Sequence, residues 1–226
     1  YLNQIGLPDF LKRPLQKKLQ DRGIALEFSE LKLHWARGFV AEHVRFGLSD
    51  ATNNPAASTI SGNLALGSTT RTFAIGDSTN AAADLTVSAV ISGAGGLTKT
   101  GAGTLVLGSA GNTFTDLYFN LGLVQADSLA KLGTGTLNFF GGGLQFTGVY
   151  DASSKTITVG TGGATFDTNG NDISFANAIG NAGAGSLTKI GSGSLTLNAA
   201  STFTGATIIT AGRLILDGGS GRLSTT

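Results

Sequence analysis

Residues 93–108 read GAGGLTKTGAGTLVLG, and residues 183–198, ninety positions later, read GAGSLTKIGSGSLTLN. Ten of the sixteen aligned positions are identical, and the matches are glycines, alanine, leucines and a Thr-Lys pair. The likeness extends beyond these stretches, because AsnThrPheThr at 112–115 corresponds to SerThrPheThr at 201–204. An internal repeat of this kind indicates a repeat architecture.

Apolar residues alternate within each copy, as Leu105 and Leu107 do on either side of Val106. A period of two residues is typical of β-strands, and these runs have the usual strand length. Glycine pairs such as Gly101 and Gly103 separate the runs, and glycine accepts the positive φ angles that tight corners require. The sequence therefore predicts many short strands joined at glycine corners.

Short strands with glycine corners can close as a sandwich, a barrel or a solenoid. The repeat favours the solenoid, because each coil of a β-helix meets the same neighbours as the coil before it. We expect an all-β fold, a right-handed parallel β-helix over residues 51–226, with coils of roughly 20 to 25 residues. The repeat period then spans about four coils, and about seven or eight coils form a rod of roughly 35 to 40 Å.

Composition agrees with a β-helix after residue 50. This part holds 31 of the 35 glycines, and the last proline is Pro55, as expected because the interior of a strand ladder excludes proline. Its seven basic and eight acidic side chains provide no electrostatic surface for nucleic acid. The chain has no cysteine, which excludes disulfides and Cys-based zinc sites, and we expect no cofactor.

Residues 1–50 differ from the rest and predict a separate N-terminal module. Residues 8–22 predict a basic amphipathic helix, since three leucines recur there at four-residue intervals. Residues 24–35 and 40–48 alternate around an AlaArgGly turn, which predicts a β-hairpin with a bulge near Ser29 and Glu30. We expect this helix and hairpin to cap the β-helix of residues 51–226.

The repeated stretch resembles the autotransporter-associated β-strand repeat, also called the passenger-associated transport repeat. That pattern joins a glycine-rich turn, Leu-Thr-Lys, Gly-x-Gly-Thr-Leu, Asn-Thr-Tyr/Phe-Thr-Gly and Gly-x-Leu. The first copy departs from it at Asp116, where the pattern has glycine. The matching residues are Leu97, Lys99, Gly101, Gly103, Leu105, Leu107, Phe114, Leu187, Lys189, Gly191, Gly193, Leu195, Leu197, Phe203, Gly212 and Leu214.

This resemblance covers roughly residues 58–226 and implies a role for the chain. It implies a non-enzymatic structural stalk of a bacterial cell-surface or secreted protein of autotransporter-passenger type, which supports export and display or adhesion. The partners that it implies are the neighbouring β-helix coils of a longer chain and a surface ligand or glycan.

The N-terminal residues LPDFLKRPLQKKLQDRGIALEFSELKLHWARGFVAEHVRFGLSD resemble the start of AsmA/TamB-like envelope proteins. This second resemblance implies an alternative: a periplasmic protein tethered to the inner membrane and involved in lipid transport or outer-membrane integrity. Residues 1–7 are too short to cross a bilayer, so the anchor or signal would lie outside this sequence. The chain contains no methionine, and we expect it to be a fragment.

Three groups of side chains are candidate sites, each with a simpler interpretation. Asp151, Asp167 and Asp172 can serve a carbohydrate-active β-helix enzyme, although turn chemistry explains them. His34 and His43, with Glu30 or Glu42, can bind a metal across the hairpin, although a solvated strand face is the favoured interpretation. A basic helix face can lie on anionic lipid or simply in solvent; it consists of Lys12, Arg13, Lys17, Lys18 and Arg22.

Lys99 and Lys189 occupy equivalent places in the two copies. We expect both to point outward and to protect a strand or turn against edge association. On this hypothesis a charge in place of an inward leucine unfolds several coils, whereas Lys189→Ser is nearly silent.

Overall fold

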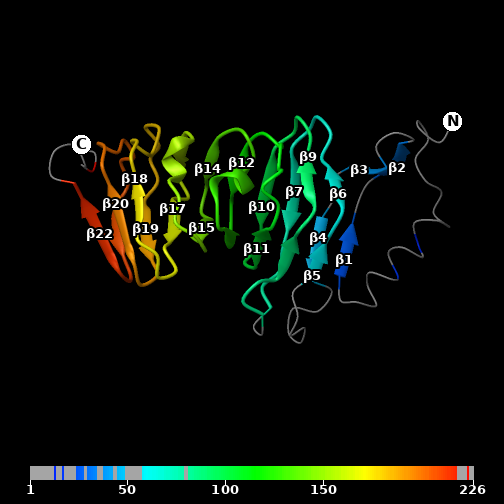
Figure 1. Ribbon diagram of the computed structural model, residues 1–226, viewed down its shortest axis with the longest axis horizontal. Coiled ribbons are helices and arrows are strands. Elements are labelled where there is room, and N and C mark those ends of the chain that lie inside the picture. The colour runs from blue at the N-terminus through cyan, green and yellow to red at the C-terminus, as the bar shows by residue number, and fades with distance from the viewer. Residues whose placement is uncertain are drawn as a thin grey trace.

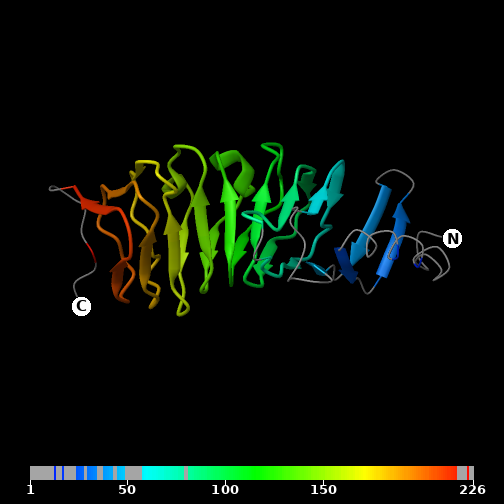
Figure 2. The same ribbon diagram turned by 90° about the horizontal axis from the view of Figure 1, so that it is seen from below.

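The computed structural model describes residues 58–78, 81–217 and 223, together with Arg13, Lys17 and four strands between residues 24 and 48. From residue 58 onward the chain winds into a β-solenoid, whose short parallel strands stack along the long axis of a rod (Figure 1). A view turned by 90° shows the same stack of coils from below (Figure 2). The all-β solenoid predicted from the sequence is confirmed.

One sheet runs along the whole solenoid and defines its coils. Its eight strands pair in parallel over seven steps, which correspond to about 34 Å at the usual strand spacing. One step takes from 19 residues, between Thr104 and Leu123, to 27 residues, between Ser58 and Leu85. The strands are β5 (Ser58–Ile60), β8 (Leu85–Val87), β11 (Thr104–Leu107), β13 (Leu123–Ala126), β15 (Gly143–Phe146), β17 (Ala164–Asp167), β19 (Leu187–Ile190) and β21 (Thr207–Ile209).

In the sequence, each strand of the second side of the coil comes directly before a strand of the eight-stranded sheet. This side forms a five-stranded parallel sheet in the first coils and continues beyond it as a single bridge between Thr158 and Gly180. Its strands are β7 (Arg71–Ala74), β10 (Leu97–Thr100), β12 (Leu117–Phe119), β14 (Leu137–Phe139) and β16 (Ile157–Val159).

The third side changes its structure along the rod. It begins as a two-stranded parallel sheet and ends as a three-stranded one, and between them it consists of loops and two short 3₁₀ turns. The first sheet pairs β6 (Asn63–Ala65) with β9 (Val90–Ser92), and the last contains β18 (Ile173–Phe175), β20 (Ser194–Leu197) and β22 (Arg213–Leu216). The turns are η1 (Leu129–Leu132) and η2 (Ala152–Ser154).

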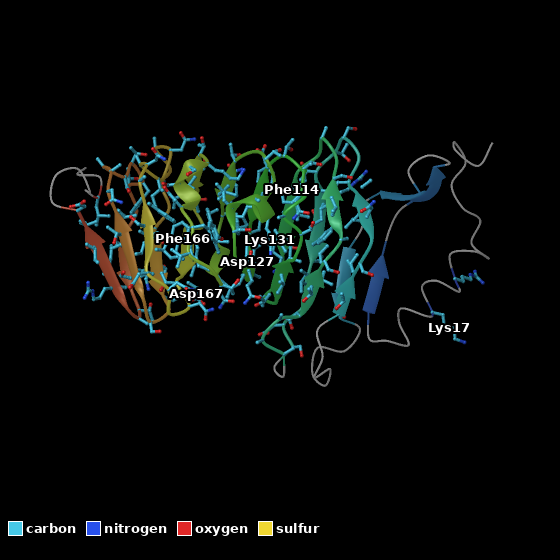
Figure 3. The ribbon with its side chains drawn as sticks, in the orientation of Figure 1. Lys17, Phe114, Asp127, Lys131, Phe166 and Asp167 are labelled. Carbon is cyan, nitrogen blue, oxygen red and sulfur yellow. The ribbon has the colours of Figure 1, made fainter. Side chains whose placement is uncertain are left out.

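The core is a continuous column of inward side chains. In most strands of the solenoid, residues alternate between buried and partly exposed, so that one face of each such strand contributes to the column. In-register pairing stacks like residues, and the rings of Phe119 and Phe139 lie parallel with centroids 4.1 Å apart. Phe166 meets Phe139 edge-on at 5.1 Å, inside the rod (Figure 3). Each such side chain contributes about 1.5 to 3 kcal/mol when it leaves water.

The two copies of the repeat occupy different sides of the coil. In the first copy β10 belongs to the five-stranded sheet and β11 to the eight-stranded sheet. In the second copy β19 belongs to the eight-stranded sheet and β20 to the three-stranded sheet. Four steps along the eight-stranded sheet lead from β11 to β19, so the repeat advances four coils and one further side. The prediction of about four coils missed this extra side.

The N-terminal hairpin is confirmed, but its bulge is not. Strand β2 (Glu30–His34) pairs antiparallel with β3 (Gly38–Glu42), and β1 (Ile24–Glu27) with β4 (Arg45–Leu48). The described pairs share one register, from Ile24↔Leu48 to His34↔Gly38, and the bulge predicted near Ser29 and Glu30 falls on Ser29, which lies outside the described residues. Strand β4 lies next to β7, where the solenoid begins.

Little of the expected N-terminal helix falls within the described residues. Arg13 and Lys17 are helical and exposed, and the rest of residues 8–22 lies outside the described part of the chain. The division into residues 1–50 and 51–226 stays a prediction.

The burial pattern makes Leu105 and its neighbour Val106 a matched pair for testing the core. Leu105 is fully buried, whereas Val106 is partly exposed on the outer face of the same strand. We expect Leu105→Asp to lower the free energy of unfolding by more than about 4 kcal/mol, because it places an unpaired carboxylate in the apolar column. Val106→Asp should cost less than about 1.5 kcal/mol. Urea titrations followed by circular dichroism measure both, and equal losses would refute the inward assignment.

Candidate functional site

Two buried lysines form the most distinctive polar sites of the solenoid. Lys99 in β10 and Lys189 in β19 are both fully buried. Lys99 lies in an inward row between Phe73 and Phe119 of the adjacent coils. Its aliphatic stem can therefore pack in the core while its ammonium group reaches the corner after the strand. The expectation that these lysines point outward is wrong.

Each ammonium group meets three backbone carbonyl oxygens. Lys99 Nζ donates to Thr100 O at 3.1 Å, to Gly101 O at 2.7 Å and to Leu121 O at 3.0 Å. A lysine has three N–H donors, so the donor capacity of Lys99 is fully used. Two of the acceptors belong to its own corner and the third to the next coil.

Lys189 repeats this geometry one side further around the coil. Its Nζ donates to Ile190 O at 2.7 Å, to Gly191 O at 2.8 Å and to Ala211 O at 3.2 Å. The acceptor in the next coil is 22 residues ahead of the lysine, as it is for Lys99. We call these two arrangements the lysine locks, because each joins two successive corners.

Glycines make the corners of the lysine locks possible. Gly101 and Gly191 both have φ of 78°, a left-handed conformation that turns the chain so that its carbonyl faces the ammonium group. Gly122 and Gly212 follow the third acceptor with φ of 69° and 71°. A Cβ on Gly212 would lie 2.8 Å from Lys189 Nζ. The glycines of the motif are therefore corners, as predicted.

The remaining repeat residues fall into the core or against the preceding coil. Eight of them are buried apolar residues: Phe203 is 2% exposed, and the other seven are at most 1% exposed. Leu214 is partly buried, and Gly103 and Gly193 pack against backbone of the coil before them. The buried apolar residues are Leu97, Leu105, Leu107, Phe114, Leu187, Leu195, Leu197 and Phe203.

Aspartates form a second set of connections between coils, which sequence reasoning missed. Asp84 is buried and accepts from Thr104 N at 2.7 Å, one coil ahead. Asp116 accepts from both N and Oγ1 of Thr136, each at 2.8 Å. The Thr136 backbone N–H is the main reason that the pKa of Asp116 lies below its usual value. The sequence feature that could have predicted these bonds is a Thr or Ser about 20 residues, one coil, after an aspartate.

The three aspartates considered for catalysis are engaged in similar bonds. Asp151 accepts from Ser153 N at 2.8 Å, and Asp167 accepts from Gln145 Nε2 at 2.7 Å. Asp172 accepts from Ser194 Oγ at 2.6 Å, and this bond is the first cause of its lowered pKa. Their hydrogen bonds hold turns and neighbouring coils, which supports a structural role over a catalytic one.

The candidate metal and membrane sites gain no geometric support. The hairpin register pairs His34 with Gly38, five residues before position 43, and His43 itself lies outside the described residues. Within the described part of the chain no three His, Cys, Asp or Glu side chains gather in a way that could hold a metal ion. Of the basic face, Arg13 and Lys17 are exposed, and Lys12, Lys18 and Arg22 lie outside the described residues.

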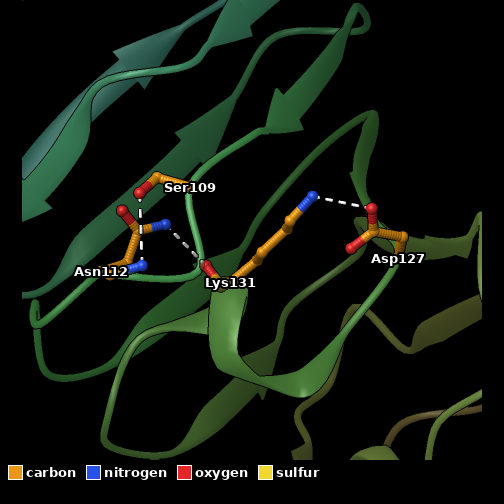
Figure 4. A network of polar contacts seen from close by, with 5 residues as sticks. Ser109, Asn112, Asp127 and Lys131 are labelled. Atoms are coloured by element: carbon orange, nitrogen blue, oxygen red, sulfur yellow. Dashed lines mark hydrogen bonds and ion pairs between the residues drawn. The ribbon is translucent and has the colours of Figure 1, made fainter. Parts of the chain in front are cut away.

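Asn112 of the AsnThrPheThr segment is a further connector between coils. It is 5% exposed, its Oδ1 accepts from Ile91 N at 2.8 Å, and its Nδ2 donates to Lys131 O at 2.8 Å. Lys131 in turn pairs with Asp127 at 2.8 Å on the surface (Figure 4). The second copy has Ser201 instead, which is buried and whose Oγ has no partner within the described residues.

Comparison with known proteins supports one of the two resemblances. Residues 97–116 and 187–216 match the family model of the passenger-associated transport repeat. Each matched segment begins at the strand that contributes a lysine lock. The AsmA/TamB-like resemblance of the N-terminal residues is not supported. No curated protein and no solved structure matches the chain. Among the described residues no helix is both long and apolar enough to cross a bilayer.

The lysine locks predict a large difference between two lysine substitutions. We expect Lys99→Ala to lower the free energy of unfolding by about 2 to 4 kcal/mol, because three partly buried carbonyls lose their donor and a cavity forms where the buried stem was. Lys99→Met, which keeps most of the volume, should cost less and isolates the loss of the hydrogen bonds. Lys131→Ala, which removes an ion pair with the half-exposed Asp127, should cost under about 1 kcal/mol. Similar melting temperatures for Lys99→Ala and Lys131→Ala would contradict the lock.

A second prediction concerns pH. Burial lowers the pKa of Lys99 from 10.5 to about 8, and the charge of Asp84 partly opposes this change. Between these two values the unfolded chain binds more protons at this position than the folded chain. The contribution of Lys99 to the free energy of unfolding should therefore rise with pH in this window, by up to about 1.4 kcal/mol per unit.

The measurement is the difference in unfolding free energy between the unaltered protein and Lys99→Met at several pH values across that window. Subtraction removes the titration of the tyrosines and of the other lysines. A difference that falls as pH rises would show that the carbonyls favour the ammonium form more than burial disfavours it.

Proposed function

We propose that this chain is part of the structural stalk of a bacterial cell-surface or secreted protein of autotransporter-passenger type, and that it supports export and display or adhesion. The observation that carries the proposal is the eight-stranded parallel sheet, which continues through both segments that match the passenger-associated transport repeat. A rod of this kind holds another part of a protein at a distance from the cell.

The contacts between coils suit a chain that folds in one direction. Each coil meets only its neighbours, so that a solenoid can nucleate at one place and propagate. The lysine locks and aspartates add a polar bond to nearly every such step, as from Lys99 to Leu121 O and from Asp116 to Thr136 N. A coil that has just folded therefore presents to the next coil both an unpaired strand edge and polar side chains that can hydrogen-bond to it.

Charge and polar chemistry favour this role over catalysis. The described charged side chains of the solenoid mostly bond within the fold, as Asp151 does with Ser153 and Asp172 with Ser194. A glycosidase needs two free carboxyl groups on either side of a bond to be cleaved. The carboxylates of Asp151, Asp167 and Asp172 instead accept hydrogen bonds from backbone and side-chain groups of the fold.

Cell-surface labelling distinguishes the stalk from the periplasmic alternative. Antibodies against the solenoid should label intact cells that produce the protein, or detect it in the medium. Labelling that requires permeabilisation of the outer membrane would reject the stalk and support the tethered periplasmic protein.

The lysine locks provide a variant for the same assay. We expect Lys189→Ala to lower the amount of protein at the surface several-fold, because coils that close poorly stay accessible to proteases during export. Lys131→Ala is the matched control and should reach the surface in normal amounts. Equal surface levels for the two variants, with equal total synthesis, would contradict this prediction and show that export does not depend on the lysine lock.

A further inference from the structure

The outer face of the five-stranded sheet contains a groove that none of the roles above uses. It has a volume of about 270 Å³ and is lined by Thr70, Thr98, Tyr118, Asn120 and Phe140. These residues come from successive coils, since Tyr118 of β12 pairs with Thr98 of β10. The groove therefore crosses several coils of the rod.

Two aromatic rings lie along the surface of this sheet, each over a glycine. A Cβ on Gly96 would lie 3.2 Å from the Tyr118 ring, and a Cβ on Gly160 would clash with the Phe140 ring. Without these side chains beneath them, the rings can lie against the backbone and present a face to solvent. Phe140 is 46% exposed, an unusual state for a phenylalanine in a well-packed solenoid.

Groups next to the Tyr118 ring are held by hydrogen bonds within the fold. The Asp116 carboxylate lies beside the Tyr118 hydroxyl, where it adds to the effect of burial in raising the pKa of that hydroxyl, and it accepts from Thr136 N at 2.8 Å. Asn138 Nδ2 donates to Thr136 Oγ1 at 2.8 Å and extends this network along the sheet. The surroundings of the Tyr118 ring are thus ordered before any ligand arrives, which reduces the entropy lost on binding.

The chemistry of the lining selects a class of ligand. Thr70, Thr98 and Asn120 offer hydroxyl and amide groups, which both donate and accept hydrogen bonds. The lining holds no Lys, Arg, Asp or Glu, so neither phosphate nor a charged peptide finds a partner there. Exposed aromatic faces carry negative potential and favour the C–H groups of a flat apolar ligand face. A sugar ring combines such a C–H face with hydroxyl groups around its edge.

We propose that this groove binds an internal stretch of a neutral glycan, with sugar rings on Tyr118 and Phe140 and their hydroxyls on Asn120, Thr70 and Thr98. The open groove accepts a polymer that continues beyond both ends. No carboxylate lines the groove, so the glycan is held without being cleaved. This proposal is independent of the export role, because a stalk can be displayed whether or not this face binds.

Affinity electrophoresis tests the proposal with defined probes. The protein is run through gels that contain hydroxyethylcellulose, xyloglucan, galactomannan or dextran, and through a gel with anionic polygalacturonate. We expect retardation by at least one of the neutral polysaccharides. Phe140→Ala and Asn120→Ala should each weaken that retardation roughly tenfold, the change expected from the loss of one specific contact.

Val149→Ala is the matched control, because Val149 is 70% exposed and does not line the groove. It should bind as the unaltered protein does. Circular dichroism and melting temperature check the fold, and if Phe140→Ala is destabilised, the exposed Asn120→Ala and Thr70→Ala variants decide the result.

Several outcomes would overturn the proposal. These are no retardation by any neutral polysaccharide, retardation by polygalacturonate only, or neutral binding that Phe140→Ala and Asn120→Ala leave unchanged. Sedimentation velocity provides one more: a dimer that Phe140→Ala converts to a monomer would make the groove an interface between two copies of the chain.

Discussion

Hydrogen bonding between successive coils is the constraint on which the rest of this solenoid depends. A strand of three or four residues is too short to be stable alone, and each backbone group on its edge needs a partner in the next coil. Parallel pairing in constant register supplies these partners from β5 to β21. It also stacks each inward side chain on its counterpart, so the same geometry that satisfies the backbone builds the apolar column.

Corners are where this ladder stops, and there the chain needs other partners for its carbonyls. The lysine locks supply them, because Lys99 and Lys189 each place an ammonium group among three carbonyl oxygens at a glycine turn. Asp116 and Asn112 serve N–H and C=O groups of neighbouring coils in the same way. Most of the scarce charges of the solenoid therefore serve the fold, and the groove on the outer face of the five-stranded sheet is lined by neutral polar and aromatic groups.

Much of the fold could be predicted from the sequence, because strand alternation and glycine corners are local properties. The alternation of Leu105 and Leu107, for example, correctly indicates an inward row. The side of the coil that each copy occupies is not local: it depends on the summed lengths of all the coils between. The three sides of a coil are similar enough that a strand, a glycine corner and a strand fit any two consecutive ones. The second copy consequently begins in a different sheet from the first.

The sequence by itself thus determined the solenoid, its short strands and its glycine corners, since these follow from period and composition. Only the tertiary structure decided the direction of Lys99 and Lys189. Lysine on a strand usually faces water, and the three carbonyls that offset its burial come partly from a coil 22 residues ahead. The groove around Tyr118 and Phe140 likewise could not be predicted from the sequence. Its residues belong to separate coils and meet only because the coils stack.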